Sequence, residues 1–281
     1  MALIVAGHGA IDPWAPTLAS PADASPVWVF LDESNFDDGA TSLTATAAIV
    51  IAHDDRDRLE SNMAALHREI RLGENFWYDE NPERREIFAR GFHATTSNVR
   101  INDEIRNRIR SLPFRIYIAH SRRSDSRLVP RYASLYVSII TKLLRRYEGS
   151  PMAFVFEQHE ELAPHFKTIV TMARGRARDP RTVLSATDSL TVEAALAERN
   201  QLVVAQAGKT VPGCAIADAV LYDFGTAVRA GLLAPGERKP RTSYQVRYWT
   251  HELAPRVAYE YDFDRDDHVG RRSRRRRVES H

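Results

Sequence analysis

The stretch that decides the fold is VWVFLDES, residues 27–34, an apolar run that ends in two carboxylates. A short apolar run of this kind is typical of a buried strand. Because Asp32 directly follows Leu31, we expect it at the carboxyl end of the strand or within its last pair, where open α/β sheets gather ligands. A buried, unpaired carboxylate is costly, so an acid here indicates a cation or a hydrogen-bond partner. The alternative is that Asp32 and Glu33 simply begin a turn.

Two further acids occupy comparable places. Glu157 ends a second apolar run, AFVFE, residues 153–157, and could likewise begin a turn. Asp218 lies in an apolar, helix-like stretch, residues 214–228, too far from the helix start to be an N-cap. It could also be a partly exposed acid, and Asp223 is a weaker candidate because it points elsewhere. Three acids on separate core elements indicate a site for Mg²⁺ or Mn²⁺, since hard cations bind carboxylates and can activate water for phosphodiester cleavage.

Candidate proton-transfer groups are fewer. His93, His120 and His159 all lie near predicted strand ends, where a histidine is more typically exposed or hydrogen-bonded than a ligand. We select His93, in GFHA, as a proton-transfer group, and Glu33 as a further catalytic candidate beside Asp32. The sequence contains no glycine-rich phosphate loop, no Ser-His-Asp signature and no His-Glu-x-x-His zinc motif.

The order of predicted elements indicates a mixed α/β sheet with helices on both faces. Residues 41–51 form a second strand, so the first two strands make a hairpin. We expect further strands at 86–95, 114–119, 153–157, 182–186 and 201–205, with a possible edge strand at 244–249. We expect helices at about 54–70, 102–112, 130–147, 161–173 and 212–230. The stretch 174–180 and the segment after 235 are expected to be loops or additions at the edge of the sheet.

The composition of the chain limits the classes of protein to which it can belong. The chain has 281 residues, 43% of them hydrophobic and 27% charged, which is ordinary for a globular protein. We expect a proline-rich arm at 1–26, a single domain with C-terminal additions at 27–262 and a basic tail at 263–281. Cys214 is the only cysteine, which excludes an internal disulfide and a thiolate zinc cluster and fits a reducing cytoplasm. No apolar run approaches the ~20 residues of a membrane helix, so we expect neither a membrane partner nor a signal peptide.

Positive charge is concentrated at the end of the sequence. The formal net charge is +2, but residues 271–281 hold six arginines and one glutamate, so the preceding 270 residues carry a net −3. The six arginines are Arg271, Arg272, Arg274, Arg275, Arg276 and Arg277. Such a run is most often a solvated tail. The functional alternative is sequence-independent attraction to nucleic-acid phosphates, although no aromatic residue is interleaved for base stacking.

Several short motifs, in order, resemble one family. FLDES at 30–34, FHA at 92–94, the strand at 154–157 and PGCAIAD at 212–218 resemble landmarks of the microbial domain of unknown function 3800 family. The resemblance spans roughly residues 27–230. It implies a ribonuclease-H-like fold, that is, a mixed sheet flanked by helices on both faces with an acidic metal site.

The resemblance also implies roles for the three acids. Asp32 would be the first-strand acid, Glu157 the acid of a later strand and Asp218 the acid of the closing helix. Glu157 departs from the pattern, because that strand commonly offers Asp, one methylene shorter. The implied function is divalent-metal-dependent hydrolysis of nucleic acid, DNA or RNA, in a phage-defence or mobile-element setting. The alternative is a catalytically inactive module that binds nucleic acid or a protein partner, and a homo-oligomer is left open.

We predict that deletion of residues 271–281 weakens nucleic-acid binding and flattens its salt dependence, with little effect on folding. Each arginine that neutralises a phosphate of a single strand adds roughly 0.7 to the slope of log affinity against log salt concentration. A binding titration at several salt concentrations measures that slope. Equal slopes with and without the tail would show that its arginines do not contact phosphates.

Overall fold

The computed structural model describes residues 25–37, 42–72, 91–94, 99–122, 127–198, 200–231 and 240–265. The arginines at 271–277 and nearly all of the predicted proline-rich arm therefore lie outside the described residues. A seven-stranded mixed sheet runs through the described part in the order β5-β6-β4-β1-β2-β3-β7. The strands are β1 (Val27–Asp37), β2 (Ser42–Ala52), β3 (Arg115–Ser121), β4 (Met152–Glu157), β5 (Thr182–Ser185), β6 (Gln201–Ala207) and β7 (Val257–Asp262).

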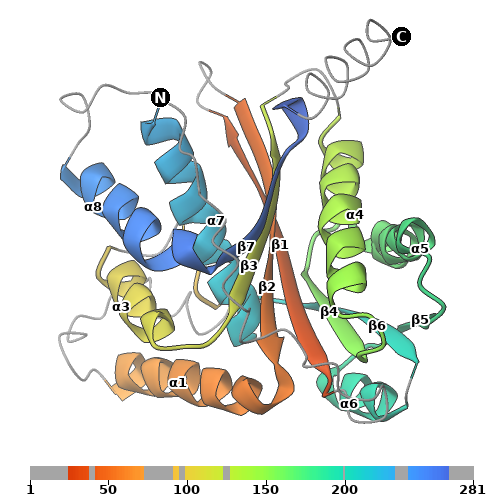
Figure 1. Cartoon of the computed structure of the whole chain (residues 1–281). Coiled ribbons are helices and arrows are strands. Elements are labelled where there is room, and N and C mark those ends of the chain that lie inside the picture. The colour runs from red at the N-terminus through yellow and green to blue at the C-terminus, as the bar shows by residue number, and fades with distance from the viewer. Residues whose placement is uncertain are drawn as a thin grey trace, which may run out of the picture.

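Helices cover both faces of this sheet, as the sequence predicted (Figure 1). The α-helices are α1 (His53–Leu72), α3 (Val99–Arg110), α4 (Leu128–Arg146), α5 (Phe166–Ala177), α6 (Ser189–Ala197), α7 (Pro212–Ala230) and α8 (Pro240–Tyr248). Short turns of other helix types are η2 (Ala163–His165), η4 (Trp249–Leu253) and η5 (Ala254–Arg256). Helices α1, α3, α7 and α8 lie on one side of the sheet, and α4 and α5 lie on the other.

The central strand β1 separates two hydrophobic cores. Trp28 and Phe30 point into the core beneath α1, α3 and α7. Val29 and Leu31 point into the core beneath α4 and α5. Because side chains alternate along a strand, a strand covered by helices on both faces must be apolar at every position, as residues 27–31 are.

Helix α7 lies along β1 and follows the same direction. A Cβ atom added at Gly213 would lie 2.2 Å from the ring of Phe30, and one added at Gly225 would lie 2.4 Å from the ring of Phe36. The two contacts fix both ends of the helix against the strand. This close approach holds the middle of α7, including Asp218, over the middle of β1.

The first strand is longer than its apolar run predicts. The predicted β1–β2 hairpin is confirmed, but its antiparallel register continues from Val27 opposite Ala52 to Asp37 opposite Ser42. Asp32 therefore lies in the middle of β1 rather than at its carboxyl end. Residues 35–37 belong to β1 as well, because the hairpin ladder extends past the two acids.

Three other predicted elements differ from the structure. Residues 244–249 are not an edge strand but belong to α8 and η4; Gln245 and Tyr248 are both buried, three positions apart, as on a helix face. The edge strand beside β3 is β7 instead. Of the strand predicted at 86–95, only 91–94 are described, and there only an isolated bridge from Gly91 to Lys209 forms. Helix α5 begins at Phe166, after a turn containing Pro164, and continues to Ala177.

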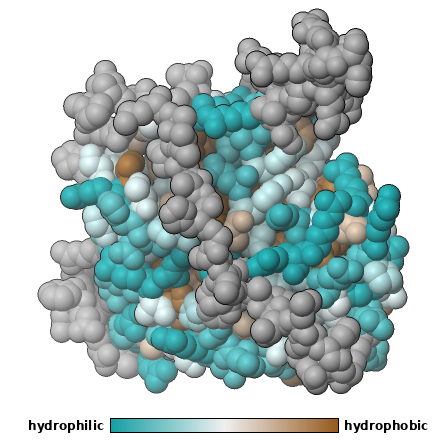
Figure 2. Space-filling view, viewed as in Figure 1, coloured by the Kyte–Doolittle hydropathy of each residue, from teal (hydrophilic) through white to brown (hydrophobic). Residues whose placement is uncertain are grey.

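On the face shown in Figure 2, most of the described surface is hydrophilic and the hydrophobic areas are small and scattered. Within the described ranges, no helix combines the length and the apolar character that crossing a bilayer requires.

We predict that Gly213→Ala destabilises the protein by about 1–3 kcal/mol, the usual cost of overpacking a core. The added methyl group would collide with the Phe30 ring and push α7 away from β1. Gly175→Ala in α5 is the matched control, since a Cβ atom there meets nothing within 4 Å. Replacing that helical glycine should be neutral or stabilise by up to about 1 kcal/mol. Urea denaturation measures both changes, and equal unfolding midpoints for the two variants would contradict the close approach.

Candidate functional site

Asp32 and Glu157 lie side by side on neighbouring parallel strands. The β1–β4 register pairs Leu31 with Phe156, so the next residue of each strand is one of the two acids. Asp32 is only 1% exposed; its Oδ1 accepts the Glu33 N–H at 2.7 Å, and its Oδ2 has no hydrogen-bond partner among the described residues. Burial, followed by the Glu157 carboxyl, raises the pKa of Asp32 well above its usual value, while Lys209 acts in the opposite direction.

Asp218 reaches the same place from α7. It is 8% exposed, and its Oδ2 accepts the backbone N–H of Ala94 at 2.5 Å. The charge of Asp218 also raises the pKa of Asp32. The acids predicted from three separate elements are therefore brought together on one face of the sheet.

A lysine that sequence reasoning missed lies between these acids. Lys209, in the loop between β6 and α7, places Nζ 3.0 Å from Glu157 Oε1 and 3.1 Å from Asp218 Oδ1. Its side chain is only 6% exposed. Burial lowers the pKa of Lys209, but the charges of Asp32, Asp218 and Glu157 outweigh that effect, so the pKa lies above its usual value. The lysine is therefore a permanent cation in this cluster.

His93 lies at the rim of the cluster. Its Nε2 is 3.0 Å from Lys209 Nζ and its Nδ1 is 3.7 Å from Asp218 Oδ2, and its side chain is 40% exposed. Gly91 brings this segment close, with φ +83° and a bridge to Lys209. A Cβ atom at Gly91 would lie 2.1 Å from the Lys209 carbonyl carbon, so only glycine fits. The segment 91–94 thus contacts the cluster at both Lys209 and Asp218.

Glu33 lies on the other face of the sheet. The Tyr136 hydroxyl of α4 donates a hydrogen bond to Glu33 Oε2, and His159 Nε2 lies 3.9 Å from Oε1. Burial raises the pKa of Glu33 to about 7, the Tyr136 hydrogen bond opposes this rise, and the Glu157 charge adds to it. The structure thus brings Asp32, Glu157 and His93 to the Lys209 side and turns Glu33 toward α4.

The weaker candidates have structural partners. Asp223 is fully buried, and both of its oxygens accept hydrogen bonds from Arg106, at 3.0 and 2.7 Å. His120 Nε2 lies 3.3 Å from Glu260 Oε1. Neither residue contacts Lys209 in the part of the chain that the structure describes, so we assign both to the scaffold.

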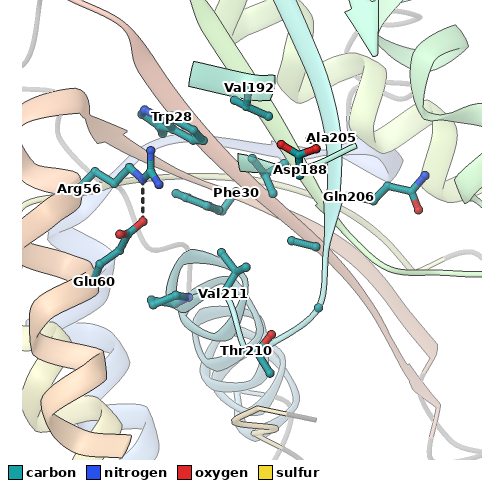
Figure 3. Close-up of a pocket in the computed structure, with 14 residues that line it drawn as sticks. Trp28, Phe30, Arg56, Glu60, Asp188, Val192, Ala205, Gln206, Thr210 and Val211 are labelled. Carbon is teal, nitrogen blue, oxygen red and sulfur yellow. Dashed lines mark hydrogen bonds and ion pairs between the residues drawn. The ribbon is translucent and has the colours of Figure 1, made fainter. Parts of the chain in front are cut away.

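A pocket of about 440 Å³ lies beside the loop that carries Lys209, and its described lining residues do not include the acids of the cluster (Figure 3). Trp28 and Phe30 line it from the same face of β1 as Asp32, and Thr210 and Val211 line it from the loop that carries Lys209. The Arg56 guanidinium lies 4.0 Å above the Trp28 ring. The pocket has an apolar floor, and its polar edge includes the carboxylates of Glu60 and Asp188.

Neither the acidic cluster nor the whole chain is matched by a known family. The sequence matches no protein-family model, and a search of the curated proteins finds no significant match. The resemblance to the domain of unknown function 3800 family therefore stays a prediction. Within the described ranges, no group of three His, Cys, Asp or Glu side chains is arranged to hold a metal ion, and the Lys209 ammonium contacts both Glu157 and Asp218.

We predict that Asp223→Asn destabilises the protein by about 3 kcal/mol, because it leaves the buried Arg106 guanidinium with only the exposed Asp103 carboxylate, 2.7 Å from Nη1. Asp218→Asn should change stability by no more than about 1 kcal/mol. Asn can still accept the Ala94 N–H, and relief of repulsion with Asp32 offsets the weaker attraction to Lys209. Chemical denaturation of both variants checks the contrast, and a larger loss for Asp218→Asn would mean that this acid belongs to the scaffold.

Proposed function

We propose that the acidic cluster hydrolyses phosphodiester bonds of nucleic acid with the help of Mg²⁺ or Mn²⁺. The observation that carries this proposal is the meeting of Asp32, Glu157 and Asp218 from β1, β4 and α7 around one cation, Lys209. Carboxylates are costly to bury together, and their concentration at one place favours a site that binds positive charge.

The donors fit a hard divalent cation. All are carboxylate oxygens, the ligands that Mg²⁺ and Mn²⁺ prefer, and the buried Asp32 Oδ2 is free of hydrogen bonds to the described residues. Asp32, Glu157 and Asp218 would hold the ion, after Lys209 has moved away from the last two. When bound, such an ion activates a water molecule and stabilises the charge of the leaving oxygen.

Lys209 and His93 supply the remaining chemistry. Once displaced from Glu157 and Asp218, the Lys209 ammonium is free to pair with the scissile phosphate, where a preorganised cation stabilises developing negative charge. His93 is the most exposed of these groups, so it can exchange a proton with the substrate or with solvent.

The strand order supports a ribonuclease-H-like assignment. The middle five strands run β6-β4-β1-β2-β3, with an antiparallel β1–β2–β3 meander and parallel β4 and β6. This is a mixed sheet flanked by helices, as the resemblance implies, with β5 and β7 added at the edges. A phage-defence or mobile-element setting rests on the resemblance alone.

A second candidate function is a catalytically inactive module that binds nucleic acid or a protein partner. The observation that favours it is the Lys209 ammonium itself, which already neutralises Glu157 and Asp218 at about 3 Å. In such a module the lysine replaces the metal permanently. The two functions differ in whether a divalent ion can displace the lysine.

We predict that the protein cleaves nucleic acid only when Mg²⁺ or Mn²⁺ is present. Asp32→Asn and Asp218→Asn should each slow cleavage by at least about 100-fold, which is the effect expected when a group that stabilises transition-state charge is lost. Single- and double-stranded DNA, RNA and a DNA–RNA hybrid are the substrates, with EDTA as the blank. Asp54→Asn, an exposed acid in the first turn of α1, is the matched control and should cleave normally.

Calorimetric titration with Mn²⁺ separates the two functions. For a nuclease, Lys209→Met should tighten Mn²⁺ binding, since the competing ammonium is gone, and still impair cleavage. For an inactive module, neither the wild type nor Asp54→Asn binds Mn²⁺ or cleaves any substrate. Unchanged cleavage by Asp218→Asn under saturating metal would reject this site for the reaction.

A further inference from the structure

A second cavity, of about 470 Å³, lies between β7 and α4, on the opposite side of the sheet from Asp32. We call it the β7 groove. Its aromatic wall is Tyr259, Tyr261 and Phe263. Its basic side chains are Lys142, Arg145 and Arg176, from α4 and α5. The groove takes no part in the acidic cluster.

The aromatic wall is built by the alternation of the edge strand. Tyr259 and Tyr261 point to the same face, with ring centroids 6.2 Å apart and planes only 6° from parallel. Phe263 continues the row edge-on, 5.9 Å from Tyr261. All three rings are partly exposed. A row of rings beside solvent is the kind of platform on which successive bases stack, whatever their sequence.

The opposite wall carries the charge. Lys142 Nζ lies 5.7 Å from the centre of the Tyr259 ring, and Arg145 donates a hydrogen bond to the Arg176 carbonyl at 3.0 Å. No carboxylate lines the groove in the described part of the chain. The three acids nearest in sequence have other partners: Glu260 lies beside His120, Asp262 pairs with Arg265, and Asp264 accepts the Arg122 N–H.

The charge of the groove favours nucleic acid over a protein partner. Three cations without a lining carboxylate match a phosphate backbone, whereas a protein strand added to the edge of β7 would need no basic wall.

We propose that the β7 groove binds single-stranded nucleic acid, with bases against Tyr261 and its neighbours and phosphates against Lys142, Arg145 and Arg176. The proposal shares its ligand class with the proposed nuclease function and does not require cleavage. The groove is a binding surface separate from the acids. In a nuclease it would hold a substrate strand while the cluster acts on that strand. In an inactive module it would bind the strand without cleavage.

Fluorescence anisotropy in EDTA tests the groove without cleavage. The probes are labelled 20-nucleotide oligo-dT and oligo-U, titrated with the full chain at several salt concentrations. Tyr261→Ala should weaken binding roughly fivefold to a hundredfold, the effect of losing one stacked base. Lys142→Gln combined with Arg145→Gln should lower the salt slope by about 1.4, at roughly 0.7 for each lost phosphate contact.

Matched controls lie away from the groove. Tyr244→Ala removes a partly exposed aromatic ring from α8, and Lys167→Gln removes an exposed cation from the opposite end of α5; both should bind like the wild type. Tyr261→Phe keeps the aromatic ring and should bind like the wild type. Comparison with Tyr261→Ala then separates the loss of a stacked base from misfolding.

The outcomes distinguish this proposal from the nuclease function. Wild-type affinity and slope in the groove variants, or no binding of either oligonucleotide by the wild type, would overturn the groove. Binding that depends on the groove without any Mg²⁺- or Mn²⁺-dependent cleavage would leave the groove standing and reject the nuclease. A preference for oligo-dT or oligo-U assigns the strand to DNA or RNA.

Discussion

The structure depends on the attraction between one buried ammonium and the carboxylates around it. Asp32, Glu157 and Asp218 are held in a poorly solvated place where like charges repel and ionisation is costly. Lys209 contacts two of these groups at about 3 Å and lowers the pKa of the third. Without a cation at this point, the middle of β1, the end of β4 and the first half of α7 would carry uncompensated negative charge.

The same lysine joins segments that are far apart in the sequence. Its backbone bridges Gly91, and its side chain contacts Glu157 of β4 and Asp218 of α7. Asp218 in turn accepts the Ala94 N–H, so the segment 91–94 is fixed at two points. The cluster is therefore part of the tertiary structure as well as a candidate site. Because the segment that carries His93 is held by Lys209 and Asp218, the position of His93 depends on the charges of these two residues.

The sequence revealed the parts of this arrangement that follow from local patterns. Charge inside an apolar run stands out, so Asp32, Glu157 and Asp218 could be selected from the order of residues alone. Lys209 could not, because a lysine in a Gly-Lys-Thr loop is typical of a solvated surface, and its burial depends on the order of β6, β4 and β1. The side of the sheet taken by Glu33 was predictable, since neighbouring residues of a strand point to opposite faces.

Features that depend on contacts between distant segments could not be predicted from local patterns. The alternating residues 244–249 fit a strand or a helix, and contact with the core selected the helix. The close approach of α7 to β1 is possible because Gly213 has no side chain where the helix meets the Phe30 ring. In evolutionary terms this makes the two positions interdependent: a homologous chain that acquires a side chain at 213 must also acquire a smaller residue at 30, and the pair should covary.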